Sequence, residues 1–266
     1  MEFSPAARLL LERRYLLPGE TPDALFARVA GAVGGPERSR EFFSLLSRLL
    51  FLPNSPTLMN AGTPAGQLSA CFVLPIEDTL EGIFTSLAHM ALIHRSGGGT
   101  GFSFSRLRPR GDAVNGVVGA ASGPVSFMRV FDAATGAVRQ GGRRRGANMG
   151  VLAASHPDIE EFVTAKRAGG LRNFNLSVGV DERFLRCLAT GKDYDLTNPR
   201  DGSVSRSIDP ASLWRLIAAS AHASGEPGVL FLDEINRQST TPHLGPIEAT
   251  NPCGEQPLYP YESCNL

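Results

Sequence analysis

The segment Asn251-Pro252-Cys253-Gly254-Glu255 carries three side chains that can do chemistry. Cys253 offers a thiol that can donate a hydrogen atom or an electron, Glu255 a carboxylate that can act as a general base, and Asn251 a carboxamide that can orient a substrate. If the segment is extended, the spacing of two residues places all three side chains on one face. The alternative is a proline-rich turn in which Asn251 and Glu255 only satisfy backbone groups. Spacing alone leaves both interpretations open.

The chain has four cysteines, Cys71, Cys187, Cys253 and Cys264, and none forms a Cys-x-x-Cys pair. This spacing argues against a zinc site or another thiol-redox or metal protein, so we predict no metal ligands. A permanent disulfide framework is not expected in a cytosolic chain of this size. Taken singly, each cysteine is typical of a small buried apolar residue.

Two glycine-containing loops could approach a ligand. Residues 96–101 read SGGGTG, which is neither a P-loop nor a dinucleotide fingerprint. Such glycines let backbone come close to a ligand, although the segment taken alone favours a flexible helix-to-strand connection. Residues 141–148 read GGRRRGAN, and three adjacent arginines suit phosphate or base recognition. A solvated run of charge is the alternative for this loop.

Composition narrows the class of protein. The 266 residues include 26 Lys+Arg and 26 Asp+Glu, so the net charge is zero and supplies no field to attract nucleic acid or a membrane surface. There is no apolar run of about 18 residues, and the charged N-terminus is unlike a signal peptide. We therefore expect a cytoplasmic protein without nucleic-acid or membrane partners.

The elements that must position these residues follow from hydrophobic periodicity. Residues 1–52 predict a helical N-terminal domain of three helices, one of which begins at Thr21-Pro22. The third helix is expected over residues 37–52, with one apolar face. That face consists of Phe42, Leu45, Leu46, Leu49 and Leu50. Residues 53–266 form the second predicted domain.

Within residues 53–266, short apolar runs alternate with helical patterns. Strands are expected at 71–74, 101–105, 147–153, 173–180 and 228–233, and helices at 124–138, 157–168, 181–190 and 210–224. A further helix is expected to be capped by Asp78, with Glu81 three residues later. This alternation predicts an α/β domain with largely parallel strands. Residues 240–266 are proline-rich and predict a long structured loop, after which the chain ends at the apparent start of another element.

Taken together, five segments resemble the large catalytic chain of ribonucleotide reductases, most closely the adenosylcobalamin-dependent class II. They occur in family order and extend through nearly all of the chain after residue 53. The segments are PNSPTLMNAG (53–62), SAC (69–71), SGGGTGF (96–102), GRRRGANMG (142–150) and NPCGE (251–255).

The resemblance implies a fold and a mechanism. The fold would be the first half of a ten-stranded α/β barrel, with a finger loop at its centre. Cys253 at the fingertip would be the thiyl-radical residue, generated with adenosylcobalamin, and would abstract the ribose 3′-hydrogen. Glu255 would be the base on the 3′-hydroxyl, and Asn251 would hold the substrate. Cys71 and Cys264 match the two cysteines that reduce the 2′ position and become a disulfide, a transient one of the kind that a cytosolic enzyme can use.

The resemblance also implies binding sites. Substrate-contacting positions are matched by Ser55, Ala70, Cys71 and Gly99, with Arg144 as a further contact. Asp78 and Arg108 match positions that bind the sugar and the phosphates of a deoxynucleoside triphosphate effector. Asn115 stands where some relatives place a second phosphate-binding arginine.

The remaining expectations concern partners. The substrate would be a ribonucleoside diphosphate or triphosphate, the reductant a thiol protein such as thioredoxin, and the assembly a homodimer. The second half-barrel is not in this sequence, so we expect an N-terminal fragment, or one piece of a split gene that needs the C-terminal half of the same enzyme. Two alternatives remain: a class I large subunit, whose radical comes from a second protein, and a non-catalytic nucleotide-binding module.

Overall fold

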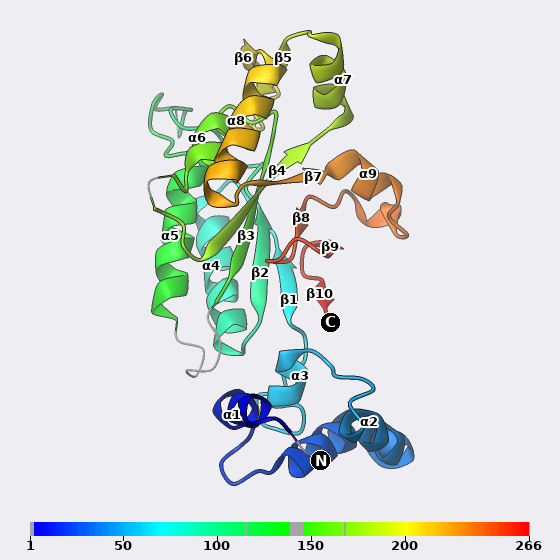
Figure 1. Cartoon of the computed structure of the whole chain (residues 1–266). Helices are drawn as coiled ribbons and strands as arrows, with labels where there is room; N and C mark the ends of the chain where they lie inside the picture. The colour runs from blue at the N-terminus through cyan, green and yellow to red at the C-terminus, as the bar shows by residue number, and fades with distance from the viewer. Residues whose placement is uncertain (1–2, 115, 139–145, 168, 266) are drawn as a thin grey trace.

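The N-terminal region is helical. The computed structural model describes residues 3–114, 116–138, 146–167 and 169–265, and Figure 1 shows the N-terminal helices below the sheet. The helices here are α1 (Pro5–Arg14), α2 (Pro22–Ser47) and α3 (Ser55–Asn60). As predicted, Thr21 caps α2, because its side chain accepts a hydrogen bond from the backbone N–H of Ala24. The apolar cluster between these helices extends past residue 52 to Leu58 and Ala61.

Helix α2 contains a kink and ends earlier than predicted. Gly35 adopts φ +55° just before Pro36, so α2 consists of two helical arms. The second arm ends at Ser47 rather than at residue 52, because Leu49 takes a left-handed conformation while the backbone N–H of Leu50 bonds to the carbonyl of Leu45. The predicted apolar face was therefore wrong at its end: Leu49 and Leu50 are 51% and 61% exposed.

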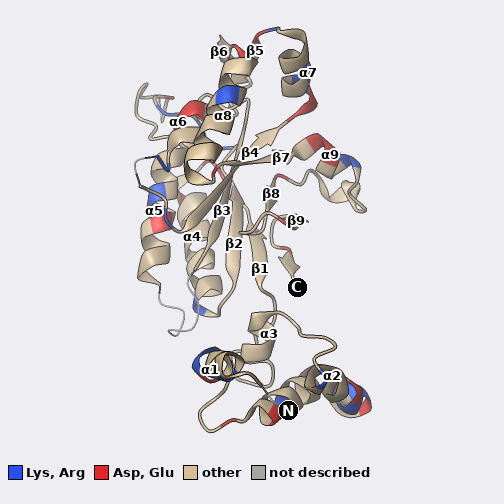
Figure 2. Ribbon diagram, in the orientation of Figure 1, with Lys and Arg blue, Asp and Glu red and all other residues tan. Residues whose placement is uncertain are grey.

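The rest of the chain is built on a mostly parallel sheet, as predicted. Its strand order in the described residues is β10-β1-β2-β3-β4-β7, and only β10 runs antiparallel. The strands are β1 (Cys71–Leu74), β2 (Gly99–Ser103), β3 (Asn148–Ala153), β4 (Phe174–Val180), β7 (Gly228–Phe231) and β10 (Ser263–Cys264). None of them carries a charged residue (Figure 2), and the central strands β2, β3 and β4 are almost entirely buried. The ten-stranded barrel stays a prediction, and the described residues form an open sheet.

Helices cover one face of this sheet. Each parallel strand lies beside the one before it, which places the connecting helices on the same side (Figure 1). These helices are α4 (Leu80–Arg95), α5 (Pro124–Ala137), α6 (Ile159–Thr164) and α8 (Pro210–Ser224). The large apolar core lies between them and the strands, with Phe102, Phe104 and Phe131 in edge-on or tilted ring contacts.

The opposite face of the sheet receives the C-terminal part of the chain. Strands β8 (Ala249–Thr250) and β9 (Pro257–Leu258) form an antiparallel hairpin, and Ala249 and Leu258 pack against Val73, Met149 and Val151. The region predicted as one long loop therefore contains this hairpin, β10 and a short 3₁₀ helix, η1 (Pro242–Leu244).

Three further elements lie around the sheet. Helix α7 (Glu182–Thr190) was predicted, whereas α9 (Leu232–Arg237) and the antiparallel hairpin of β5 (Tyr194–Thr197) and β6 (Val204–Ile208) were not. No helix in the described parts of the chain is long and apolar enough to cross a membrane.

The predicted cap of α4 was wrong by one residue. The N-cap is Thr79, whose side-chain oxygen accepts from the backbone N–H of Gly82 at 3.0 Å. Asp78 is instead bonded to Arg108, through Oδ2 to Nε at 2.7 Å. Both carboxylate oxygens of Asp78 accept bonds from Arg108, in an ion pair in which both partners are charged.

Candidate active site

The segment 251–256 is a turn at the tip of the β8–β9 hairpin. The backbone N–H of Asn251 donates to the carbonyl of Gln256 at 3.1 Å, and the backbone N–H of Gly254 donates to the carbonyl of Asn251 at 3.0 Å. Gly254 has φ +83°, a conformation that glycine adopts without strain. Of the two alternatives left by the sequence, the structure has the turn.

Asn251 nevertheless does more than close this turn. Its Oδ1 accepts from the backbone N–H of Gln256 at 3.0 Å, and its Nδ2 donates to Sγ of Cys71 at 3.2 Å. Asn251 is fully buried and Cys71 is 4% exposed, so the carboxamide ties the hairpin to the thiol of β1.

Glycines of β2 make room for the hairpin. A Cβ on Gly101 would lie 1.7 Å from the carbonyl oxygen of Thr250, and a Cβ on Gly99 would lie 2.6 Å from Cγ of Pro252. Real Cβ atoms do not approach other atoms this closely, so any larger residue would push the hairpin off the sheet. The glycine-rich segment thus admits the backbone of the hairpin, and the approach of a ligand to these glycines stays a prediction.

Cys71 and Cys264 lie opposite each other on neighbouring strands. They are direct partners in the antiparallel pairing of β1 and β10. Directly opposed residues in such a pair have Cα atoms about 4.5–5.5 Å apart, within the range that a disulfide spans. The fold therefore brings together two thiols that are 193 positions apart in the sequence (264 − 71).

The remaining two groups of the fingertip face the solvent. Cys253 and Glu255 are both exposed, in contrast to Asn251. Burial raises the pKa of the Cys264 thiol, and the negative charge of Glu255 raises it further. The charge of the Glu255 carboxylate therefore reaches the Cys264 thiol of β10.

The predicted substrate contacts are divided among several elements. Ala70 lies at the same edge as the cysteine pair, because its N–H donates to the carbonyl of Cys264 and its carbonyl accepts from Gly99. Ser55, at the start of α3, bonds through its hydroxyl to that of Tyr15 at 2.9 Å. Arg144 and Asn115 lie outside the described residues.

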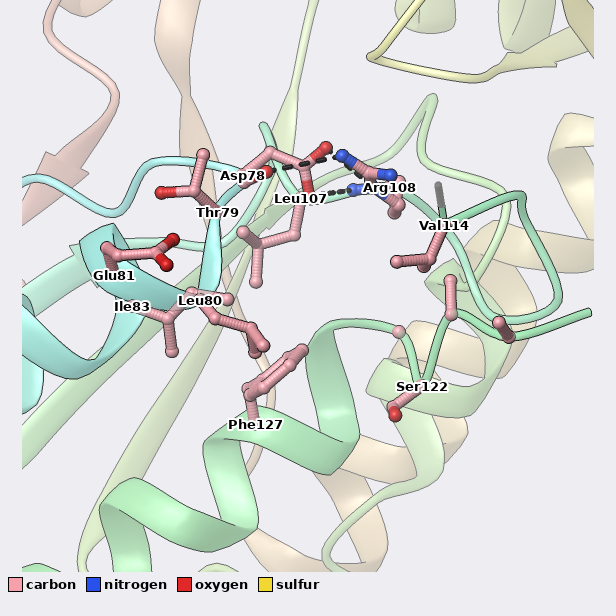
Figure 3. A pocket seen from close by; sticks show the side chains of 13 residues that line it. Asp78, Thr79, Leu80, Glu81, Ile83, Leu107, Arg108, Val114, Ser122 and Phe127 are labelled. Atoms are coloured by element: carbon pink, nitrogen blue, oxygen red, sulfur yellow. Dashed lines mark hydrogen bonds and ion pairs between the residues drawn. The ribbon is translucent and has the colours of Figure 1, made fainter. Parts of the chain in front are cut away.

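A cavity of about 560 Å³ lies at the N-terminal ends of α4 and α5. Figure 3 shows the Asp78 carboxylate and the Arg108 guanidinium facing each other at one end, with the ring of Phe127 at the other. Leu80, Ile83 and Leu107 supply further apolar lining. The cavity thus combines a charged end with an apolar end.

Arg108 is held by several acceptors. Besides the bond from Nε to Asp78, its Nη1 donates to the carbonyl of Ala113 at 2.8 Å, and its backbone N–H donates to Oδ1 of Asp78 at 3.1 Å. The two predicted effector residues are therefore bonded to each other at the rim of one cavity.

The structure adds residues that the sequence did not single out. Asn175 of β4 donates from Nδ2 to the carbonyl of Pro252 at 2.7 Å, so it holds the fingertip. Asn54 bonds to Asn265, which fixes the end of β10 to the start of α3. An isolated Asn in a strand or before a proline-containing helix is common, so no local pattern could have marked either residue.

Cys187 matches its predicted structural role, and His94 belongs to a buried polar network. Cys187 is partly buried against the main apolar core, apart from the cysteine pair in the fold. His94, near the end of α4, is fully buried and bonds to Oγ1 of Thr100 at 3.0 Å; Thr100 donates to Asn148, which donates to Thr135. Burial lowers the pKa of His94 to about 4, so the imidazole is neutral at pH 7.

Family models match both parts of the chain. The model of the ribonucleotide reductase all-alpha domain matches residues 1–66, and that of the ribonucleotide reductase barrel domain matches residues 69–266.

Curated relatives give the same family. A vitamin B12-dependent ribonucleoside-diphosphate reductase of Thermoplasma acidophilum is 54% identical over 91% of this chain and 32% of its own length. One of Mycobacterium tuberculosis H37Rv is 51% identical over 100% of this chain and 40% of its own. A ribonucleoside-diphosphate reductase large chain of Neurospora crassa is 31% identical over 92% and 30%. The chain thus spans less than half the length of each of these relatives.

Proposed function

The chain belongs to the ribonucleotide reductase family, and on that basis we propose that it is a catalytic portion of an enzyme that reduces ribonucleotides to 2′-deoxyribonucleotides. One arrangement carries this proposal. Cys71 and Cys264 lie opposite each other on neighbouring strands, and the β8–β9 hairpin, which packs on the glycines of β2, has Cys253 and Glu255 exposed at its tip. A module that only binds nucleotides needs none of these four groups. Deoxyribonucleotides made in this way serve DNA synthesis.

The cysteine pair supplies the two electrons of the proposed reaction. Two thiols and a ribonucleotide become one disulfide, one deoxyribonucleotide and one water, so the 2′-hydroxyl leaves as water. The opposed positions of Cys71 and Cys264 allow the disulfide to form between neighbouring strands. In this proposal Cys253 abstracts the 3′-hydrogen as a thiyl radical, Glu255 accepts the 3′-hydroxyl proton, and Asn251 orients the substrate.

The position of Cys253 fits an external radical source. Its side chain is exposed at a hairpin tip, whereas Asn251 two residues earlier is fully buried. Since the names of the T. acidophilum and M. tuberculosis relatives specify vitamin B12, we propose adenosylcobalamin as the cofactor of this chain. When bound, it would supply the radical that makes the Cys253 thiyl. The same relatives' names favour a ribonucleoside diphosphate as substrate.

A class I large subunit is the second candidate. The N. crassa relative is a large chain, which implies a separate small one. An exposed Cys253 would also suit a radical that arrives from another protein. Identity favours the cobalamin-dependent reading, at 54% and 51% against 31%.

We assign the cavity beside α4 and α5 to a deoxynucleoside triphosphate effector. Its apolar end, with Phe127 and Ile83, suits a base, and its charged end offers Asp78 to a sugar hydroxyl and Arg108 to phosphate. The N-terminus of α5, next to Gly123, adds backbone N–H groups that favour an anion.

Further partners follow from the same proposal. A homodimer could bury a stripe of exposed apolar side chains on α4. Its members are four residues apart, and the first of them, Leu80, also lines the cavity. The stripe is made of Leu80, Phe84, Ala88 and Leu92. A thioredoxin-like reductant would restore the cysteine pair, and a cytoplasmic location would keep these thiols reduced. The catalytic site would be completed by the C-terminal half of the enzyme. We retain the proposed domains 1–52 and 53–266, which limited proteolysis can test.

The test is a reconstituted reaction. The chain is combined with a polypeptide that supplies the rest of the relatives' length, adenosylcobalamin, a ribonucleoside diphosphate and a dithiol, and deoxyribonucleotide is measured. We expect cobalamin-dependent product that Cys253→Ser abolishes and Cys187→Ser, the matched control, leaves unchanged. Product only with an added radical-generating subunit would favour class I, and no product in either system would reject the catalytic proposal.

A further inference from the structure

The tip of the β5–β6 hairpin is bonded to the loop that borders the effector cavity. Arg200 donates from Nε to Oδ2 of Asp112 at 2.9 Å and from Nη2 to Oδ1 at 3.1 Å. Asn198 donates from Nδ2 to Oδ2 of the same carboxylate at 2.9 Å. The side chain of Asp112 is only 11% exposed, so this two-point ion pair is better shielded from water than most surface pairs.

Asp112 in turn connects to the charged end of the cavity. Its Oδ1 accepts from the backbone N–H of Ala113 at 2.7 Å, and the carbonyl of Ala113 accepts from Nη1 of Arg108. The peptide group of Ala113 therefore lies between Asp112 on one side and Arg108 on the other. A shift of Asp112 would move the acceptor that holds the Arg108 guanidinium.

The charges around this end make each cation important. Arg108 pairs with Asp78 in the cavity lining, and Arg200 pairs with Asp112 and Asp201 behind it. Hydrogen bonding to Asp112 is the main cause that raises the pKa of Arg200, and the charge of Asp78 also contributes. Two guanidinium groups thus pair with three carboxylates, and loss of Arg200 would leave Arg108 as the one cation of this group.

We propose that Arg200 is a positioning residue for the phosphate-binding end of the effector cavity, an inference that rests on the effector site proposed above. It neutralises Asp112 and fixes Ala113, so that Arg108 keeps its orientation. Three of the five N–H groups of Arg108 are used by Asp78 and Ala113, which leaves the others for a ligand oxygen.

Binding of a ligand series to the 266-residue chain tests this role. The probes are a deoxynucleoside and its mono-, di- and triphosphates at one ionic strength, measured by isothermal titration calorimetry. We expect Arg200→Gln to weaken triphosphate binding about tenfold while deoxynucleoside binding changes less than twofold, because only the phosphates meet the altered charge. Arg206→Gln is the matched control: it removes an ion pair with Glu160 from the same hairpin, and should leave the series unchanged.

Two more variants separate positioning from a general structural effect. Arg200→Lys keeps the charge without the two-point geometry and should bind triphosphate with intermediate affinity. In the double variant Arg200→Gln with Asp112→Asn, the uncompensated carboxylate is gone, so triphosphate affinity should recover at least threefold over Arg200→Gln. A simple loss of folding would not be rescued in this way.

The outcomes distinguish the two proposals. Failure of the wild-type chain to bind any triphosphate rejects the effector site and this inference with it. Normal wild-type binding with equal affinity in Arg200→Gln rejects the role of Arg200 alone. A double variant that binds no better than Arg200→Gln also rejects it, because Arg200 would then not act through Asp112.

Discussion

Helix α4 has a polar cluster at each end, and the two are built differently. At its N-terminal end, Asp78, Arg108, Asp112 and Arg200 are charged and lie at a cavity and a loop. At its C-terminal end, His94, Thr100, Asn148 and Thr135 are fully or almost fully buried and uncharged. Burial without a counter-ion requires neutrality, whereas partial exposure allows ion pairs whose partners can change.

The difference corresponds to two kinds of task. The buried cluster bonds β2 and β3 to each other and to α4 and α5 through side-chain hydrogen bonds, and the β8–β9 hairpin packs on these two strands. Two members of the charged cluster, Asp78 and Arg108, line the cavity and bond to each other, so a ligand that binds there must compete with this contact. The first favours one fixed geometry, and the second favours a response to an anion.

The largest effect is expected when a side chain is added to a β2 glycine that packs against the β8–β9 hairpin. Gly101→Ala places a Cβ 1.7 Å from the carbonyl of Thr250, so the hairpin must move or the sheet must distort. We expect a loss of about 2–3 kcal/mol in the free energy of unfolding, with product formation reduced more than tenfold. Denaturant titration and the reconstituted assay measure these effects.

The control is Gly31→Ala in α2, where a Cβ would meet no described atom within 4 Å. It should stabilise the chain by about 0.5–1 kcal/mol, because alanine favours helix over glycine. Equal free energies of unfolding for Gly101→Ala and Gly31→Ala would contradict the close packing of the hairpin on Gly101.

The next effect concerns pH at the buried cluster. The pKa of His94 is lowered to about 4, so below the unfolded-state value of about 6.5 the unfolded chain binds a proton that the folded chain does not. Stability is therefore lost as pH falls from about 6.5 toward 4, by about 1.4 kcal/mol per pH unit. His94→Asn should remove this contribution. Denaturant titrations at several pH values across this range measure the free energy of unfolding. If it fell with the same slope against pH in the wild type and in His94→Asn, the predicted contribution of His94 would be ruled out.

A smaller effect is expected at the charged cluster. Asp78→Asn removes the ion pair with Arg108, whose side chains are about a quarter exposed, and should cost about 1 kcal/mol of stability. Effector affinity should fall while catalysis without effector stays within twofold, a combination that ligand titration and the activity assay together reveal. Loss of basal catalysis would show that the two clusters are not separate.

The smallest effect is on thiol reactivity. Burial and the charge of Glu255 raise the pKa of Cys264, so its alkylation should require higher pH than that of an ordinary thiol. Glu255→Gln should shift the alkylation profile of Cys264 to lower pH, as followed by peptide mass spectrometry. An unchanged profile would place Glu255 too far from β10 to act as proposed.

Local patterns predicted the regular elements well. The apolar run at residues 71–74, the proline starts of α5 and α8, and the Thr21 cap all depend on neighbours within a few positions. The shape of the fingertip depends on contacts with β2 and β4, far away in the sequence, which is why spacing left it open. The cysteine pair could be proposed only from family resemblance, because strand register between residues 71 and 264 has no local signal.

The antiparallel edge formed by β10 has a consequence for turnover. Only a few backbone bonds join it to β1 in the described chain, among them those from Ala70 to Cys264 and from Tyr261 to Val73. So short a strand has a low free energy of local unfolding, and β10 can therefore fray while the parallel strands stay intact. In the proposed reaction, fraying of the residues around Cys264 would expose the cysteine pair to a thiol reductant, and amide hydrogen exchange at Ala70 would report how often the edge opens.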